Sequence, residues 1–352
     1  MNKWMMGVCL LALFASCSKD DDNTNQSGNN NNVVDGGAGI FFSSNVTSSI
    51  VVEVEGPQTR APLTTFPANA QIGIYGIPAI DGGRNEDCDL YNKKREEDFQ
   101  PNLFNACYTY VPGYETLQTE HPATFPSRSN PSLMLYGYYP YSEEAVWREI
   151  GSAAQWVIPW KLNKDDMSAT TDYMFTGPVQ ADYSKVGVNP VVLNFQHAFG
   201  RLDFCFYSTN KDVSFSYTVQ GVKVYCSSGE SGLMSVANGE LSFSPTDLIC
   251  TYPVGNVGIT YNVPGESVAK FMFPPLQTAI KKITCTVRDG GGNVRDYTIY
   301  EYPYSGYDIS LKQGKTVLMR INFLPKDATF SGPANVDSWT GGNTIDGNIK
   351  LQ

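Results

Sequence analysis

The chain has 352 residues, a formal net charge of −10 and a hydrophobic content of 41%. It holds only 25 lysines and arginines, which argues against nucleic acid and anionic lipid headgroups as partners. Its 32 glycines, 21 prolines and 12% aromatic residues favour a β-rich protein with many turns over a helical one.

The first residues have the pattern of a secretory leader. Lys3 supplies a positive charge, and the apolar run over residues 4–14 is too short to span a bilayer. The sequence Leu-Phe-Ala-Ser-Cys that ends at Cys17 is similar to the lipobox of bacterial lipoproteins. This similarity implies a lipoprotein signal peptide over residues 1–16, and a Cys17 that carries palmitate and other acyl chains, enough for stable anchoring. The alternative is an ordinary signal peptide that is cleaved nearby, with Cys17 incidental.

A polar segment follows over residues 17–39. No apolar residue occurs between Cys17 and Val33, so this stretch cannot bury surface and is expected to be a solvated tether. Its acidic run at residues 20–22 is similar to the surface-export signal of Bacteroidetes lipoproteins. That similarity implies a lipid-anchored position on the outer face of the outer membrane. A plain spacer that faces the periplasm is the alternative.

Short strand patterns then recur along the chain, each rich in β-branched or aromatic residues and bounded by Gly, Pro, Asn or Asp. The predicted strands are residues 50–55, 71–76, 133–139, 191–195, 201–207, 221–225, 270–273, 283–287, 295–300 and 316–323. Residues 289–293 predict a hairpin loop between two of them. Residues 92–99 and 143–150 could each form a short helix.

Short strands without helical crossovers predict an all-β fold built of antiparallel sandwiches. Residues 40–352 exceed the roughly 250–300 residues at which single cores stop growing. We therefore expect two tandem antiparallel β-sandwich domains, residues 40–187 and 188–352, with the boundary near residues 182–190.

Cysteine usage leaves the redox state open. Of the eight cysteines, Cys9 leaves with the leader and Cys17 is predicted to be lipidated. The other six are Cys88, Cys107, Cys205, Cys226, Cys250 and Cys285. An exported protein permits disulfides, but the sequence does not choose a connectivity, and buried free thiols are equally compatible. No CxxC pair supports a zinc or redox motif.

No catalytic constellation is found. The nucleophile, metalloprotease and nucleotide-binding motifs are absent. The two histidines, His121 and His197, are expected to be structural residues. Residues 81–89 are rich in oxygen ligands and could bind calcium, but they lack EF-hand spacing, so a solvated loop is favoured. We expect no enzyme, no cofactor and no metal.

An ordered set of motifs resembles the fimbrillin family of Bacteroidetes, the subunits of protease-assembled pili. The motifs are Thr59-Arg60-Ala61, residues 72–75 (IGIY), 136–141 (YGYYPY), 172–175 (DYMF), 193–202 (LNFQHAFGRL), 273–275 (FPP) and 336–339 (VDSW). The resemblance spans nearly all of the expected mature chain. It implies two transthyretin-like β-sandwich domains in tandem.

The resemblance also implies a mechanism of assembly. In similar pilins a trypsin-like protease cuts after an arginine, which here falls between Arg60 and Ala61. The strand lost would be about residues 46–55, and another subunit would donate a strand to the vacated groove. The C-terminal residues 328–352 are the donor candidate, although they are Gly-rich and alternate weakly. Without the resemblance, Arg60 is an ordinary surface arginine in a linker.

A rival hypothesis is a glycan-binding surface lipoprotein of a polysaccharide-uptake system. The aromatic residues that could form a sugar platform are Trp147, Trp156, Trp160, Tyr136, Tyr138, Tyr139 and Tyr141. Core packing is the favoured role for them. The sequence thus predicts a structural or adhesive fimbrial subunit whose partners are other subunits, the outer membrane through lipid, and a host or bacterial surface ligand.

Overall fold

A computed structural model gives the fold. It describes residues 40–46, 65–79, 90–91, 93–126, 132–150, 153–182, 189–275, 278–305, 308–325, 338–339 and 342–350. The chain divides into two units, Met1–Gly36 and Gly37–Gln352, and every described residue belongs to the second.

One sheet of six described strands has the order β1-β8-β7-β4-β2-β3. Its strands are β1 (Phe42–Val46), β2 (Ala70–Ala79), β3 (Ala106–Tyr110), β4 (Ser132–Tyr139), β7 (Met174–Asp182) and β8 (Val191–His197). Strand β2, between β4 and β3, is buried almost throughout, because its alternate side chains enter two different clusters. Ile72 and Ile74 enter one cluster, and Tyr75 and Ile77 enter the other.

A smaller sheet of four described strands has the order β12-β11-β6-β5. Its strands are β5 (Val146–Ile150), β6 (Ala153–Lys161), β11 (Ser231–Ser235) and β12 (Leu241–Ser242). Trp156 on β6 stacks on Tyr75 of β2 with ring centroids 5.5 Å apart. This contact packs the small sheet against the six-stranded one.

The remaining strands form two sheets that face each other. The first has the order β13-β10-β16-β17, with β10 (Thr218–Ser228), β13 (Thr246–Gly258), β16 (Ala279–Arg288) and β17 (Val294–Glu301). The second has the order β14-β9-β18-β20-β19, with β9 (Gly200–Ser208), β14 (Thr260–Tyr261), β15 (Ala269–Phe273, paired with β9), β18 (Thr316–Leu324), β19 (Ser338–Trp339) and β20 (Gly342–Lys350). Tyr252 on β13 lies 5.6 Å from Phe271 on β15, ring centroid to ring centroid, across the interface.

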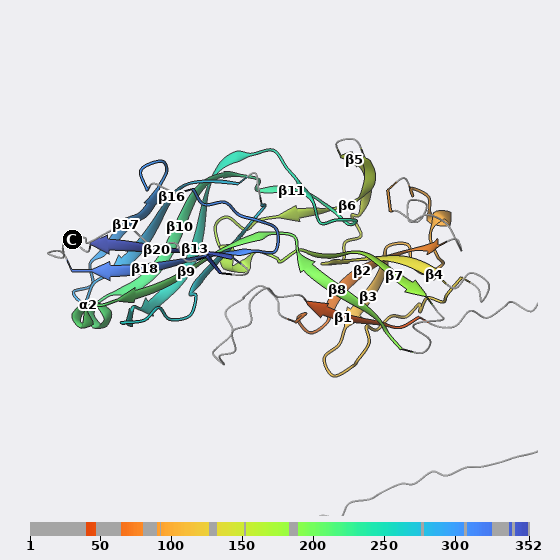
Figure 1. The fold of residues 1–352 in the computed structure, drawn as a ribbon, viewed down its shortest axis with the longest axis horizontal. Helices are drawn as coiled ribbons and strands as arrows, with labels where there is room; N and C mark the ends of the chain where they lie inside the picture. Colours follow the sequence, from red (N-terminus) through yellow and green to blue (C-terminus); the bar gives the residue numbers. More distant parts are fainter. Residues whose placement is uncertain are drawn as a thin grey trace, which may run out of the picture. The chain divides into compact units, whose positions relative to one another are not determined.

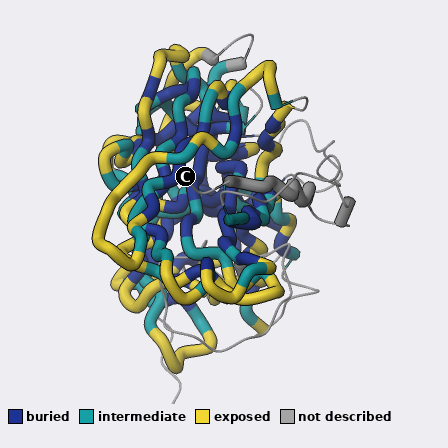
Figure 2. The backbone as a smooth tube through the Cα atoms, turned by 90° about the vertical axis from the view of Figure 1, so that its left-hand side faces the viewer, coloured by how far each residue is buried: buried dark blue, intermediate teal, exposed yellow. Residues whose placement is uncertain are grey.

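Helical structure is scarce among the described residues. It comprises two 3-10 turns, η2 (Glu96–Asp98) and η3 (Met167–Ala169), and the α-helix α2 (Lys211–Ser216). No helix in the described ranges is long and apolar enough to cross a membrane. Buried segments fill the interior of this unit, and exposed residues lie mainly along the outer turns (Figure 2).

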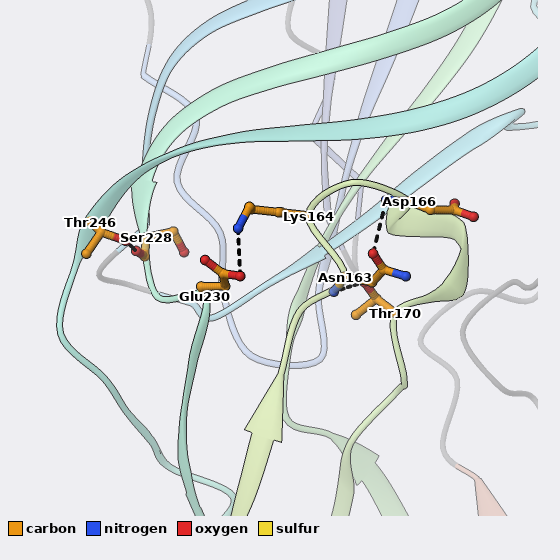
Figure 3. A network of polar contacts seen from close by, with 7 residues as sticks. All are labelled: Asn163, Lys164, Asp166, Thr170, Ser228, Glu230 and Thr246. Carbon is orange, nitrogen blue, oxygen red and sulfur yellow. Dashed lines mark hydrogen bonds and ion pairs between the residues drawn. The ribbon is translucent and has the colours of Figure 1, made fainter.

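A polar network joins the segment after β6 to the strands β10, β11 and β13 (Figure 3). Leu162 N donates to Glu230 O at 2.8 Å, and Thr251 N donates to Lys164 O at 2.7 Å. Lys164 Nζ also lies 2.8 Å from Glu230 Oε1. The ion pair is about one-third exposed, so the backbone bonds rather than the charges are expected to dominate this junction.

The predicted all-β class is confirmed, with one addition. Four of the described strand pairs are parallel rather than antiparallel, namely β1–β8, β9–β14, β9–β18 and β18–β20. The strands predicted from residue 71 onward all lie within observed strands, whereas the strand predicted at residues 50–55 lies outside the described residues. The hairpin loop at residues 289–293 is confirmed, with Asp289 N donating to Asn293 O at 2.9 Å.

Two local expectations need correction. The helix predicted over residues 143–150 is wrong, because Val146–Ile150 is strand β5. In residues 92–99 the helical part is only the short turn η2. The domain boundary stays a prediction, and strand β8, beyond residue 187, pairs with β1 and β7 of the first sheet.

Candidate assembly site

The edge strand β1 is held by backbone hydrogen bonds on two sides. Val191 N of β8 donates to Phe41 O at 2.7 Å, and the parallel register runs from Phe42 opposite Val191 to Val46 opposite Phe195. On the other side, Leu117 N donates to Phe42 O at 2.7 Å. Ile40 N donates to the carbonyl of Ala123 at 2.9 Å. We call the surface that receives residues 40–46, formed by β8 and residues 117–123, the β1 seat.

Few side chains of β1 are buried in this seat. Ile40 and Phe42 are 3% and 0% exposed, whereas Phe41 is 52% exposed. The Phe42 ring meets Tyr108 of β3 edge-on, with centroids 5.1 Å apart. The strand sequence Phe-Ser-Ser-Asn-Val is mostly polar, so β1 depends on its backbone bonds and on a small apolar contact.

The predicted processing residues Arg60 and Ala61 lie outside the described residues, between β1 and residue 65. Phe66, soon after the start of the next described range, is 4% exposed. Its ring lies 5.0 Å from Phe195 and 5.1 Å from Tyr139. A cut at Arg60 would therefore separate β1 from an anchored remainder. The predicted lipidation residue Cys17 and most of the strand expected at residues 46–55 also lie outside the described residues.

The C-terminal segment forms strand β20, inside the predicted donor region of residues 328–352. It pairs in parallel with β18 over nine residue positions, from Thr316 opposite Gly342 to Leu324 opposite Lys350. Figure 1 shows the two arrows side by side and pointing the same way. Among the described strands, the far side of β20 pairs with the two-residue strand β19. Strand β20 is thus close to the edge of its sheet.

The candidate catalytic and metal-binding residues lead to no reactive centre in the described ranges. His197 Nδ1 lies 2.9 Å from Asp172 Oδ2, with Asp172 buried and His197 partly buried. His121 is exposed, and its backbone N donates to the Thr119 hydroxyl at 3.2 Å. Among the described residues no three His, Cys, Asp or Glu side chains gather as a metal site, and the oxygen-rich residues 81–89 lie outside the described ranges. The absence of enzymatic activity stays a prediction.

The described cysteines do not form disulfides with one another, and Cys88 lies outside the described residues. Burial raises the pKa of the Cys285 thiol, and contact with Cys250 together with burial raises the pKa of Cys226. Their strand register explains why these two neighbours are not bonded. Cys226 faces Leu248 while Cys250 faces Val224, so the thiols are diagonal across β10 and β13.

The aromatic residues of the rival hypothesis are mainly core residues. Tyr136, Tyr138, Trp156 and Trp160 are at most 9% exposed. Trp147, Tyr139 and Tyr141 are half-buried and pack against the same clusters. These side chains therefore form no exposed sugar platform.

Comparison with known proteins gives the chain its family. Residues 59–339, more than half of the chain, match a family model described as fimbrillin-like. The chain belongs to the fimbrillin-like family. This membership confirms the resemblance that the ordered motifs indicate, and it supports a fimbrial or adhesion subunit. A search of curated proteins finds no match.

Solved structures of three other proteins are similar to this fimbrillin-like chain, and the fold is shared with the first of them. A proposed cell adhesion protein of Bacteroides uniformis has a TM-score of 0.50 at 16% identity, covering 82% of this chain and 94% of that one. A fimbrial protein of Bacteroides vulgatus has a TM-score of 0.49 at 12% identity, with 80% and 95% covered. A proposed cell adhesion protein of Bacteroides ovatus has a TM-score of 0.48 at 18% identity, with 81% and 92% covered.

Sequence reasoning missed two elements of this site. The strand β1 is too polar to give an apolar alternation, and β20 is too rich in Gly and Asn. The isolated Phe41-Phe42 pair at the start of β1 is the local sequence signal for a buried anchor at this point.

Proposed function

We propose that this fimbrillin-like chain is a structural or adhesive subunit of a surface fimbria. It is exported as a lipoprotein and joins its neighbours by strand exchange after proteolysis at Arg60. Family membership supports the fimbrial role. The observation that carries strand exchange is the β1 seat, in which a short polar strand fills an edge beside β8.

An empty β1 seat is unstable in water. Loss of β1 exposes the backbone edge of β8 and the N–H of Leu117, which now donates to Phe42 O. It also uncovers the side of Tyr108 that the Phe42 ring covers. A strand donated by another subunit restores both the hydrogen bonds and the apolar burial, so association replaces what cleavage removes.

Cleavage at Arg60 supplies the trigger. Before the cut, β1 is tethered to the anchored Phe66 by fewer than about twenty-five residues, so a displaced β1 rebinds as an intramolecular partner at high effective concentration. After the cut, the peptide that carries β1 is no longer covalently linked to the seat and stays with the lipid-bearing Cys17, so a displaced β1 no longer rebinds as an intramolecular partner. The same cut releases the chain from Cys17, so a lipidated protein and a polymerised one are successive forms of it.

Strand β20 is the donor in this proposal. It offers nine paired positions, whereas β1 uses five on β8, and both strands run parallel to their partners. A donated β20 must first leave β18. That cost is offset only where the recipient's seat is empty, which makes assembly depend on the cut.

Limited proteolysis tests the proposal. The purified chain, starting at Cys17 without lipid, is treated briefly with trypsin and followed by N-terminal sequencing and light scattering. We expect a new start at Ala61 and a ladder of oligomers. Arg60→Ala is expected to prevent both, whereas Arg148→Ala, at an exposed arginine of β5, should change neither. A start at Ala61 with monomers only would contradict strand exchange.

A further inference from the structure

A pocket of about 670 Å³ opens beside β3, between residues 96–104 and residues 118–121. This volume lies within the range of small-molecule sites. The floor comes from β2 and β3, where Gln71 pairs with Thr109 across the two strands. Strand alternation accounts for the floor, since Tyr108 enters the core while its neighbours Cys107 and Thr109 face the opposite side.

The walls of the pocket are fixed by hydrogen bonds. Gln100 Nε2 donates to Thr124 O at 2.8 Å, and Asn102 Nδ2 donates to Pro122 O at 3.2 Å. These two bonds join the wall at residues 96–104 to residues 122–124, which follow the other wall, residues 118–121, in the chain. Gln118 exchanges two backbone bonds with Thr109, at 2.7 and 2.8 Å, which holds the second wall against β3. A ligand would therefore meet a preformed site and would have little protein to order.

The polar groups of the pocket are mostly neutral. The lining includes the amides of Gln71 and Gln118, the hydroxyls of Thr109 and Thr119, and His121. The Gln118 amide already donates to Thr116 O at 2.7 Å, and the Thr119 hydroxyl accepts from His121 N at 3.2 Å. Within the described part of the chain, the Gln71 amide and the Thr109 hydroxyl make no hydrogen bond. Both residues line the pocket, so these groups are available to a ligand.

The charges and the apolar part of the lining narrow the ligand class further. Glu96 and Glu120 line the rim, and the described lining contains no lysine or arginine, so anions are repelled. Phe104 is half-buried and adds an apolar surface. Sugar hydroxyls both donate and accept, which matches amide, hydroxyl and carboxylate partners together.

We propose that this pocket binds a short neutral saccharide. The pocket lies on the face of β2 and β3 opposite Tyr108, and its wall at residues 118–121 belongs to the segment that also borders the β1 seat. Saccharide binding goes beyond assembly and gives the subunit an adhesive site of its own. The ammonium groups of a basic peptide would pair with the two carboxylates but accept no hydrogen bond from the Gln71 amide, whereas sugar hydroxyls both donate and accept, so the saccharide is the better match.

Binding to the uncleaved monomer tests the inference without involving assembly. Saturation-transfer NMR and calorimetry would use cellotriose, mannotriose and lacto-N-tetraose as probes, with sialyllactose and tetralysine as charged counter-probes. Each is supplied at about 10 mM, well above a weak Kd of ~1 mM. We expect at least one neutral probe to bind and both charged probes to fail.

Two variants test whether the saccharide binds in this pocket. Gln71→Ala and Thr109→Val should each weaken affinity by roughly 3- to 10-fold, the usual effect of one lost hydrogen bond. Gln196→Ala, at an exposed glutamine of β8, is the matched control and should bind as the wild type does. Thermal melts check that each variant folds. The inference is overturned if no neutral probe binds, if tetralysine binds in their place, or if both pocket variants bind normally.

Discussion

At the scale of single residues, Tyr108 reports on the β1 seat. Its ring is 1% exposed and meets Phe42 edge-on. Burial raises the pKa of Tyr108 to about 12 from the ordinary value of 10.0. The phenol is buried partly by β1 itself, so its ionisation is coupled to the occupancy of the seat.

The folded state therefore holds the Tyr108 proton more tightly than the unfolded state does. The raised pKa of Tyr108 contributes stability that is fully present below pH 10, and this stability is lost as the pH rises through about 12. We predict that Tyr108→Phe removes this loss. Urea unfolding between about pH 9 and 11.5 should show the wild type losing up to about 2 kcal/mol more than the variant. The prediction is contradicted if the free energy of unfolding falls by the same amount with rising pH in both proteins.

Residue contacts also explain why two of the family motifs occur together. His197 contacts Asp172, Ala198 N donates to Tyr173 O at 2.8 Å, and the Tyr173 and Phe199 rings lie 5.7 Å apart. The motif at residues 172–175 thus packs on the motif at 193–202. A sequence can show that both motifs are present, but only the fold shows that they form one contact surface.

At the scale of elements, strands were predictable where apolar residues are dense or alternate. Strands β2, β4 and β8 meet that condition because they bury one or both faces. The helix expected at residues 143–150 does not form, because pairing with a neighbouring strand outweighs the local helix propensity of this segment. Val146 and Trp147 pair with Val157 and Trp156 of β6, which gives this segment a sheet partner that the sequence alone does not reveal.

The anchoring of β1 is open to test by two adjacent phenylalanines. Phe42→Ala removes a fully buried ring and should lower the free energy of unfolding by about 3–5 kcal/mol. Phe41→Ala removes a ring that is 52% exposed and should cost less than about 1 kcal/mol. Denaturant unfolding measures both values, and hydrogen exchange at β8 should rise only in the Phe42 variant. Equal costs would show that β1 does not depend on this anchor.

At the scale of the whole molecule, the all-β class and the family were within reach of the sequence, because many short strands and an ordered set of motifs are visible in it. The strand edges that are proposed to take part in assembly could not be predicted from the sequence. Whether Gly342–Lys350 pairs with β18, or Phe42–Val46 with β8, depends on contacts between segments far apart in the chain. The pocket beside β3 was missed for the same reason, since Gln71, Thr109 and Glu120 show no common motif.

The most direct test of strand exchange mixes two complementary variants. One lacks residues 342–352 and is cut at Arg60, so it can only accept a strand. The other carries Arg60→Ala and keeps its own β1, so it can only donate. Native mass spectrometry of the mixture should show a one-to-one heterodimer with no longer species, and neither variant should associate alone. A mixture that stays monomeric, or a dimer that forms equally well when both partners lack residues 342–352, would contradict the account.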